Sequence, residues 1–264
     1  MTRFSIVTIC YNSEKTIERT IKSVLGQTYT DYEYIIVDGA STDATLSVIE
    51  KYIPQFEGRL KVISEPDKGI YDAMNKGIKA SVGAMIGIVN SDDWLEPDAL
   101  QIVNDAIIAN GCNYNTNYCG GINYHWDGKV KPLGVNIHSF KKQTKLYIMA
   151  GVRHPGIFVP QKVYERIGLF DDEMKLSADL DFILRCYFGG VDFVDVGKVL
   201  SNMSEGGIST NNSAKSRQYA MNDRKRMLKK FGKKGIEYGW LLYSWKLRGM
   251  VRTLLISLGL YKVS

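Results

Sequence analysis

The sequence predicts an α/β fold in which a single, mostly parallel sheet carries helices on both faces. Across residues 4–110, short apolar runs of strand length alternate with segments whose apolar residues recur at the helical period. The run 84–89 is almost continuously apolar, which is typical of a strand buried on both faces. This alternation predicts parallel strands joined by right-handed crossovers, with ligands bound beyond the carboxyl ends of the strands.

Each element of the first half has its own signal. Strands are expected where apolar and β-branched residues cluster, at 4–10, 34–37, 60–63 and 84–89. Asn12 or Ser13 is expected to cap a helix that contains 17–25, and Ser41 to Asp43 a helix that contains 46–53. Two further helices are expected, at 71–81 and 97–110.

The second half begins where the composition changes. Residues 114–133 are rich in Asn, Gly and Tyr without a helical period, which predicts a hairpin or an irregular strand. The remaining expected elements are a strand at 156–159, a helix at 161–167, a helix from the cap Ser177 through 188, an extended segment at 191–200, a loop at 202–213 and, after 214, two helices, the second near 236–258. We therefore expect an α/β domain at 1–213, with halves 1–112 and 113–213, and a helical extension at 214–264.

Composition is that of a soluble globular protein with a sizeable core, since 45% of the 264 residues are hydrophobic and 23% are charged. The four cysteines form no Cys-x-x-Cys pair, which favours a reducing, cytosolic compartment over a zinc site or a disulfide framework. The chain enters a strand without a charged and apolar leader, and no apolar run is long enough to span a bilayer.

The net charge of +6 is concentrated at one end of the chain. Residues 215–264 contain 13 Lys and Arg against two acids, Asp223 and Glu237, whereas the preceding residues contain 21 basic and 26 acidic side chains. This asymmetry predicts an anionic partner for the C-terminal end.

The strand 84–89 ends in Asn90-Ser-Asp-Asp93, followed by Trp94. Two adjacent carboxylates at the end of a buried strand repel each other, and a hard divalent cation such as Mg²⁺ or Mn²⁺ would relieve that repulsion. The alternative is a solvated Asx turn that leads into the helix begun by Pro97. A nicotinamide dehydrogenase is disfavoured, because the first strand-to-helix turn, Tyr11 to Lys15, lacks Gly-x-Gly-x-x-Gly.

Five ordered pieces of the chain carry a resemblance to a known family. They are Ser5-Ile-Val-Thr-Ile-Cys-Tyr-Asn12, Ile36-Val-Asp-Gly-Ala-Ser-Thr-Asp43, Ser64-Glu-Pro-Asp-Lys-Gly-Ile-Tyr-Asp-Ala-Met-Asn-Lys-Gly77, Asn90-Ser-Asp-Asp93 and Ser177-Ala-Asp-Leu-Asp-Phe-Ile-Leu-Arg185. Together they resemble the bacterial inverting glycosyltransferases of sequence family two, which have the GT-A fold. The third piece is most similar to transferases of O-antigen, capsule and colanic acid assembly.

The resemblance implies transfer of a hexose or N-acetylhexosamine from a nucleotide sugar, with UDP the expected nucleotide, to a lipid-linked saccharide. Residues 1–112 would be the nucleotide-sugar half and 113–213 the acceptor half. The implied nucleotide contacts are Thr8 and Tyr11 at the base, Asp38 at the uracil imide, and Asp72, Asn75 and Lys76 beside the nucleotide and phosphates. The local alternative for Asp38 is a turn residue. For Asp72, Asn75 and Lys76 it is an ordinary polar helix face.

The resemblance also assigns the metal and the base. Asp92 would face the ribose or the water shell of the metal, and Asp93 would bind the Mn²⁺ or Mg²⁺ ion that bridges the two phosphates. Ser at position 91 departs from a full Asp-x-Asp and leaves the complete ligand set open. Asp179 matches the family's general base, which deprotonates the acceptor hydroxyl. Its local alternative is a helix N-terminal charge without a catalytic role, and Asp181 is its competitor.

The acceptor side is less defined. His154 matches a family position near the acceptor or the diphosphate, and its alternative is a structural histidine. Arg185 is expected either to contact the acceptor or diphosphate or to anchor one of the two carboxylates of its helix. Residues 205–209 resemble a loop that closes over the donor, and the alternative is a plain linker. Residues 236–258 form a basic amphipathic pattern with Trp and Leu. This pattern predicts a helix that either lies on an anionic membrane surface or packs its apolar face on the domain. A nucleic-acid binding patch is disfavoured, because bulky apolar residues separate the Lys and Arg residues.

The resemblance, together with the basic C-terminal pattern, implies a metal-dependent enzyme that works on a polyprenyl-diphosphate-linked saccharide at the inner face of the bacterial plasma membrane. The competing hypothesis is a catalytically silent GT-A scaffold that only binds nucleotide or membrane.

Overall fold

The computed structural model describes residues 3–135, 152–205, 213–232, 243 and 247. The strands are β1 Phe4–Cys10, β2 Tyr32–Asp38, β3 Leu60–Ser64, β4 Met85–Ile88, β5 Trp94–Leu95, β6 Thr116–Trp126, β7 Lys129–Leu133, β8 Ile157–Pro160 and β9 Asp192–Ser204. The helices are α1 Ile17–Leu25, α2 Thr45–Glu50, α3 Ile70–Ala80, α4 Ala99–Ala109, α6 Gln161–Ile167, α7 Ala178–Phe188 and α8 Ala214–Lys230, with short 3₁₀ helices η1 Ile53–Phe56 and η2 His154–Gly156.

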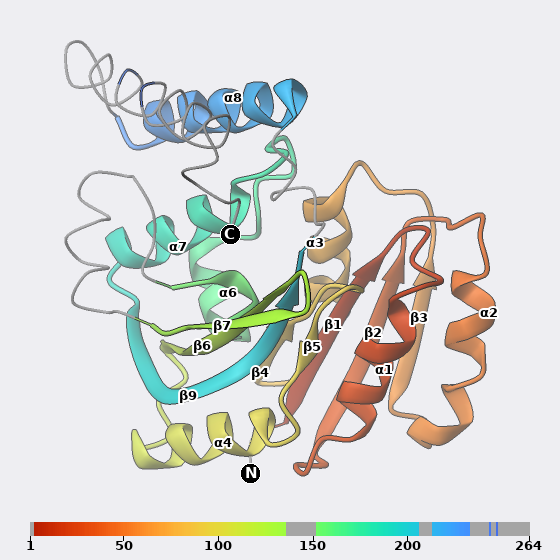
Figure 1. The fold of residues 1–264 in the computed structure, drawn as a ribbon. Coiled ribbons are helices and arrows are strands. Elements are labelled where there is room, and N and C mark those ends of the chain that lie inside the picture. Colours follow the sequence, from red (N-terminus) through yellow and green to blue (C-terminus); the bar gives the residue numbers. More distant parts are fainter. Residues whose placement is uncertain (1–2, 136–151, 206–212, 233–242, 244–246, 248–264) are drawn as a thin grey trace.

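The strands form one nine-stranded sheet in the order β3-β2-β1-β4-β8-β6-β9-β5, with β7 paired to β6 (Figure 1). The first four strands in this order are parallel, as the strand–helix alternation predicts. β8 pairs antiparallel with β4 and with β6, whereas β6 and β9 are parallel. The parallel half places the loops that follow β1, β2, β3 and β4 at one edge of the sheet, where a ligand is expected.

Helices cover both faces of the sheet. Along β1, Val7 and Ile9 face a core that includes residues of α3, α6 and α7, whereas Phe4 and Ile6 face a second core that includes residues of α1 and α4. β2 and β4 alternate in the same way between the two cores. Because successive side chains of a strand point to opposite faces, an apolar run without polar interruption is what a sheet covered on both sides requires.

The boundaries of two predicted helices are corrected. The first helix begins at Ile17 with Thr16 at the N-cap, because Ser13 instead forms a turn in which its carbonyl accepts from the amides of Thr16 and Ile17. The second ends at Glu50, and Ile53 lies in η1 with 42% of its surface exposed, not on a buried helix face. Pro54 explains the second correction, because it has no backbone N–H to donate to the carbonyl of Glu50, four residues earlier.

The hairpin predicted within 114–133 is confirmed as β6 and β7. Asp127 and Gly128 connect them with positive φ angles of 44° and 69°, the combination that a tight I′ turn requires. The loop predicted at 202–213 begins later, because β9 continues to Ser204, and 206–212 lies outside the described residues.

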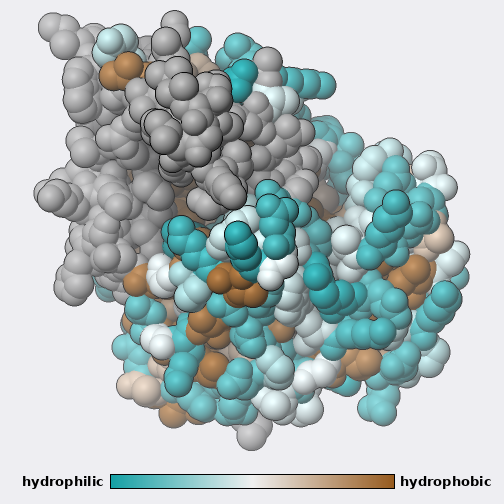
Figure 2. Space-filling view, in the orientation of Figure 1, coloured by the Kyte–Doolittle hydropathy of each residue, from teal (hydrophilic) through white to brown (hydrophobic). Residues whose placement is uncertain are grey.

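The C-terminal extension begins with α8, which lies above α6 and α7 in Figure 1. The second predicted helix, 236–258, lies outside the described residues apart from Tyr243 and Leu247. Among the residues that the structure describes, no helix is both long enough and apolar enough to cross a membrane. On the face in Figure 2, hydrophilic residues predominate over the described surface and hydrophobic ones are scattered among them.

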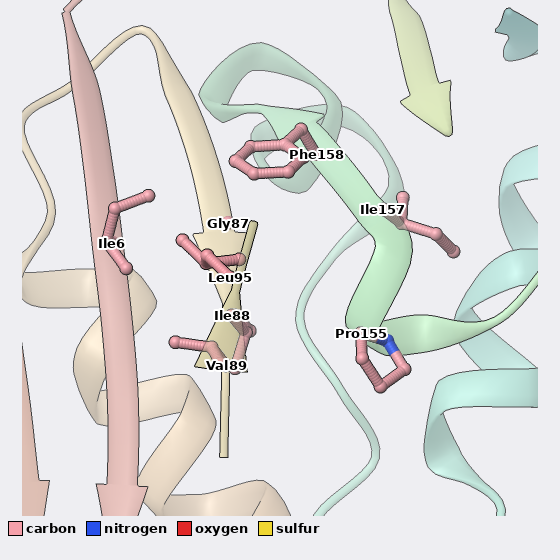
Figure 3. Close-up of a pocket in the computed structure, with 8 residues that line it drawn as sticks. All are labelled: Ile6, Gly87, Ile88, Val89, Leu95, Pro155, Ile157 and Phe158. Carbon is pink, nitrogen blue, oxygen red and sulfur yellow. The ribbon is translucent and has the colours of Figure 1, made fainter. Parts of the chain in front are cut away.

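One close contact joins the parallel half to the remaining strands. Gly87 of β4 pairs with Ile6 of β1 on one side and with Phe158 of β8 on the other. The Phe158 ring is buried and packs edge-on against Phe4, with ring centroids 5.9 Å apart. Figure 3 shows the ring turned toward β4, where a Cβ atom at position 87 would lie 2.5 Å from its Cε1 atom. Glycine therefore lets the ring pack directly on the strand.

Replacing Gly87 by Ala should destabilise the protein by about 1–3 kcal/mol, because overpacking a rigid core forces the ring or the strand to move. The measurement is the free energy of unfolding from urea denaturation. Gly134→Ala is the matched control, since no described residue lies within 4 Å of a Cβ atom there, and it should change stability by less than about 0.5 kcal/mol. An equal effect of the two substitutions would contradict the contact argument.

Candidate active site

A cavity of about 1020 Å³ opens at the carboxyl edge of the parallel strands. Its walls come from segments that are far apart in the chain: the turn after β1, the start of α3, the motif after β4, η2, the approach to α7 and the end of β9. Of the predicted site residues it is lined by Tyr11, Asp92, Asp93, His154 and Asp179. The carboxylate pair and the proposed base, 86 positions or more apart in sequence, therefore share one cavity.

The Asp93 carboxylate is held from two sides. Its Oδ1 accepts from the Ser204 amide at 3.0 Å, and its Oδ2 accepts from Asn90 Nδ2 at 3.2 Å. The side chain of Asp93 is only 2% exposed. Burial raises the pKa of the Asp92 carboxyl, and burial together with the Asp92 charge raises the pKa of Asp93 to about 7. Both carboxylates are thus costly to ionise without a compensating cation.

The donor set fits a hard divalent cation. Asp92 and Asp93 supply carboxylate oxygens, and the Oδ1 atom of Asn90 is buried beside them without a hydrogen-bond partner. The described residues contain no group of three or more His, Cys, Asp or Glu side chains arranged to hold a metal. Two carboxylates form an open set, which suits an ion that takes further oxygen ligands from a bound phosphate.

Arg19 supports this motif from α1, and its role was not predicted. Its Nη2 atom donates to the Asp92 carbonyl at 2.6 Å and to Ser204 Oγ at 2.8 Å. The guanidinium also lies over the Trp94 ring, 3.7 Å from the centroid. The end of β9 is thereby tied to the metal motif through both Arg19 and the Ser204 amide, a contact that spans more than 100 positions and leaves no local sequence signal.

Asp179 lies in the first turn of α7 and faces the cavity. The Tyr71 hydroxyl donates to its Oδ1 at 3.3 Å. Burial lowers the pKa of His154, and the negative charge of nearby Asp179 partly opposes that lowering. A carboxylate with one long hydrogen bond keeps acceptor capacity for a proton from a substrate hydroxyl.

Asp181 and Arg185 are engaged elsewhere. Asp181 is fully buried, and it pairs with Arg185 Nε at 2.8 Å and Lys230 Nζ at 3.0 Å. The other guanidinium nitrogens of Arg185 donate to backbone carbonyls of 167–169. Neither residue lines the cavity. These contacts of Arg185 are those of a carboxylate anchor.

Thr8 and Asp38 do not line the cavity. Thr8 is buried and accepts from the Tyr34 hydroxyl at 2.9 Å. Asp38 is also buried, and its carboxylate accepts from the amide and hydroxyl of Ser41 and from the Ser64 hydroxyl. In this arrangement Asp38 ties the turn after β2 to the end of β3.

The three predicted residues of α3 make contacts within the protein. Asn75 exchanges two hydrogen bonds with the backbone of Phe170, at 2.9 and 3.0 Å. Lys76 pairs with Glu65 at 2.9 Å and with Asp72 at 3.6 Å, and Asp72 also accepts from the Lys68 amide. Asp72 and Lys76 therefore shape the 65–69 loop, Asn75 joins α3 to Phe170, and none of the three lines the cavity.

The cavity wall includes charged residues that sequence reasoning did not select. Asp67 lies so close to Gly39 that a Cβ atom there would meet its Oδ2 atom at 2.5 Å, and Lys175 reaches across to the Lys68 carbonyl at 3.3 Å. Among the residues that the structure describes, seven acidic side chains and two lysines line the cavity. This excess of negative charge would repel a diphosphate unless a cation accompanies it.

Solved structures of other proteins share this arrangement of strands and helices. Among solved structures, S. aureus TarS 1-349 in complex with UDP-GlcNAc matches 98% of this chain and 76% of its own, with a TM-score of 0.67 and 20% identity. The mannosyltransferase PcManGT of Pyrobaculum calidifontis, in complex with GDP-Man and Mn²⁺, matches 99% of this chain and 76% of its own, with a TM-score of 0.61 and 15% identity. The fold is therefore that of the GT-A glycosyltransferases, as predicted.

Sequence comparison gives the family. A family model described as "Glycosyl transferase family 2" matches residues 5–168, and the chain belongs to that family. A PGL/p-HBAD biosynthesis glycosyltransferase of Mycobacterium tuberculosis is 28% identical over 188 residues, 70% of this chain and 69% of the relative. Chondroitin synthase of Escherichia coli is 32% identical over 203 residues, 75% of this chain but only 28% of the synthase.

Proposed function

We propose that this glycosyltransferase moves a hexose or N-acetylhexosamine from a nucleotide sugar to a saccharide acceptor, with inversion and with dependence on Mn²⁺ or Mg²⁺. The observation that carries the proposal is the shared cavity, in which the Asp92 and Asp93 carboxylates and the Asp179 carboxylate face one space. A cation site for a leaving diphosphate and a base for an incoming hydroxyl are the two groups that a single displacement needs.

In the proposed reaction, Asp179 accepts the proton of the acceptor hydroxyl while that oxygen attacks the anomeric carbon. The bond from this carbon to the diphosphate oxygen breaks on the opposite face, so one displacement inverts the configuration. Tyr71 orients the base through its hydrogen bond to Oδ1. A cation held by Asp92 and Asp93 would neutralise the charge that develops on the departing diphosphate.

UDP is the nucleotide we propose. TarS, which shares the fold, was solved with UDP and with UDP-GlcNAc, and PcManGT with GDP-Man and Mn²⁺. Tyr11 is exposed at the cavity wall, where its ring can stack on a base, and Asp67 lies next to it beside Gly39. In this proposal Asp38, Asp72 and Lys76 act mainly by fixing the loops that border the nucleotide. Thr8 joins β1 to β2, and Asn75 joins α3 to Phe170.

The acceptor proposed is a polyprenyl-diphosphate-linked saccharide of surface polysaccharide synthesis, at the cytoplasmic face of the bacterial plasma membrane. The relatives named for PGL/p-HBAD biosynthesis and as chondroitin and hyaluronan synthases support a role in polysaccharide synthesis. The basic amphipathic pattern of 236–258 supports contact with anionic lipid. Its two described residues, Tyr243 and Leu247, are 64% and 46% exposed, which suits an interfacial role.

Calorimetric titration of UDP, GDP and dTDP, with and without Mn²⁺, tests the proposal. We expect one nucleotide to bind in a metal-dependent manner and its sugar donor to release that nucleotide slowly into water. Binding without any release would favour the catalytically silent scaffold. No binding of any of the three in the presence of Mn²⁺ would overturn the proposed function.

A further inference from the structure

Helix α8 contacts the segment before α7 through one face. Asp223, Arg226 and Lys230, at positions i, i+3 and i+7, all reach this segment. Arg226 and Lys230 pair with Asp171 at 2.8 and 3.0 Å, and Met227 and Leu228 are completely buried beside them. Two basic residues of the C-terminal end thus pair with an acidic residue of the same chain.

Asp223 makes a different kind of contact from the two ion pairs. Its carboxylate accepts from three consecutive backbone amides, those of Lys175, Leu176 and Ser177, at distances of 2.7 to 3.1 Å. The side chain is 4% exposed. Successive amides that converge on one carboxylate form an anion-binding nest, and here the anion comes from another helix.

The nest lies immediately before the proposed base. Ser177 is the N-cap residue of α7, yet its side chain makes no capping hydrogen bond, and its carbonyl accepts the first helical bond from the Asp181 amide. Asp179 follows two residues later and points into the cavity, which Lys175 and Leu176 also line. The α8 carboxylate therefore fixes the backbone that sets the position of Asp179.

We propose that Asp223 is a positioning residue for Asp179, so that α8 is a required part of the active site. This inference rests on the proposed function, in which Asp179 is the base. Both residues lie after residue 168, where the match to the family model ends. A base displaced by about 1 Å can cost about 100-fold in rate, and three lost backbone hydrogen bonds permit such a shift.

The test compares Asp223→Asn with Arg226→Gln. The first substitution keeps the shape of the side chain but places an amide NH₂ group or a single carbonyl oxygen against three N–H donors. The second removes the pairs with Asp171 and Glu173 on the same helix face and leaves the nest intact. Asp223→Glu keeps the negative charge and should recover part of the kcat that Asp223→Asn loses. It also replaces Asp223→Asn as the test variant if that protein does not fold.

Three quantities are measured: kcat and KM for UDP release from UDP-N-acetylglucosamine with water as acceptor, UDP affinity in Mn²⁺ by calorimetry, and amide hydrogen exchange at 175–179. For Asp223→Asn we expect kcat to fall by about 100-fold, KM and UDP affinity to stay within about twofold, and exchange to accelerate at 175–177. For Arg226→Gln we expect every quantity to stay within about twofold.

A kcat of Asp223→Asn within about twofold of the wild type would overturn the proposal, and so would an equal loss in Arg226→Gln, because α8 docking in general would then explain the effect. Unchanged exchange at 175–177 would also overturn it. If the wild type neither binds UDP nor releases it from the donor, the proposed function fails, and the exchange measurement still decides whether Asp223 holds this segment.

Discussion

Replacing Asp179 by Asn should lower the rate of sugar transfer by about 1000-fold while UDP binding in Mn²⁺ is retained. The amide keeps the size of the side chain and its contact with the Tyr71 hydroxyl, but it cannot take the proton of the attacking hydroxyl. The measurement is a kcat from nucleotide release, set beside a dissociation constant for UDP from calorimetry.

Asp181→Asn is the matched control, two residues away on the same helix. Asp181 lies outside the cavity, where Arg185 and Lys230 pair with its carboxylate, so its loss should lower the melting temperature and not act selectively on kcat. Near-normal turnover in Asp179→Asn would show that another group is the base.

The second large effect is expected at Asp93. Asp93→Asn should weaken Mn²⁺-dependent UDP binding by about 100-fold, equivalent to about 2.8 kcal/mol, because the cation loses a buried anionic ligand. Asp98→Asn is the control, since that carboxylate is exposed and lies beyond the cavity wall. Unchanged Mn²⁺ dependence in Asp93→Asn would remove Asp93 from the metal site.

The same substitution should have the opposite effect on the stability of the metal-free protein. In EDTA at pH 8, Asp93→Asn should melt no lower than the wild type, because burial and Asp92 raise the pKa of the Asp93 carboxyl to about 7 and its ionised form is disfavoured. The raised pKa means that the wild type loses stability as the pH rises from about 4 to 7. The advantage of the variant should therefore shrink at pH 5, and an advantage that grows toward low pH would contradict the assigned cause.

The sequence predicts the parallel half of the fold well because each element there carries its own period. The runs 4–10, 60–63 and 84–89 are found as strands, and the helix expected at 161–167 is found with those bounds. The two-residue strand β5 has no such signal, because it forms only by pairing with β9 across more than 100 positions. The second helix was predicted to extend to residue 53, although Pro54 in the sequence already indicated an earlier end.

For the site, the sequence indicates which carboxylates occur at strand and helix ends but not which of them the protein itself satisfies. Asp93 and Asp38 both follow buried strands, yet Asp93 faces the cavity and Asp38 is enclosed by Ser41 and Ser64. Asp223 was visible only as an exception in a basic segment. Its partners lie 46 to 48 positions away, so no local pattern announces them.

The contacts of α8 bear on how freely parts of such enzymes can be recombined. If 214–264 were an independent module, a homologue's tail could replace it at the predicted boundary. The helix instead shares its ion pairs and its nest with 171–181. A chimaera should therefore exchange both segments as a matched unit, and homologues should vary at Asp171 and Asp181 in step with Arg226 and Lys230.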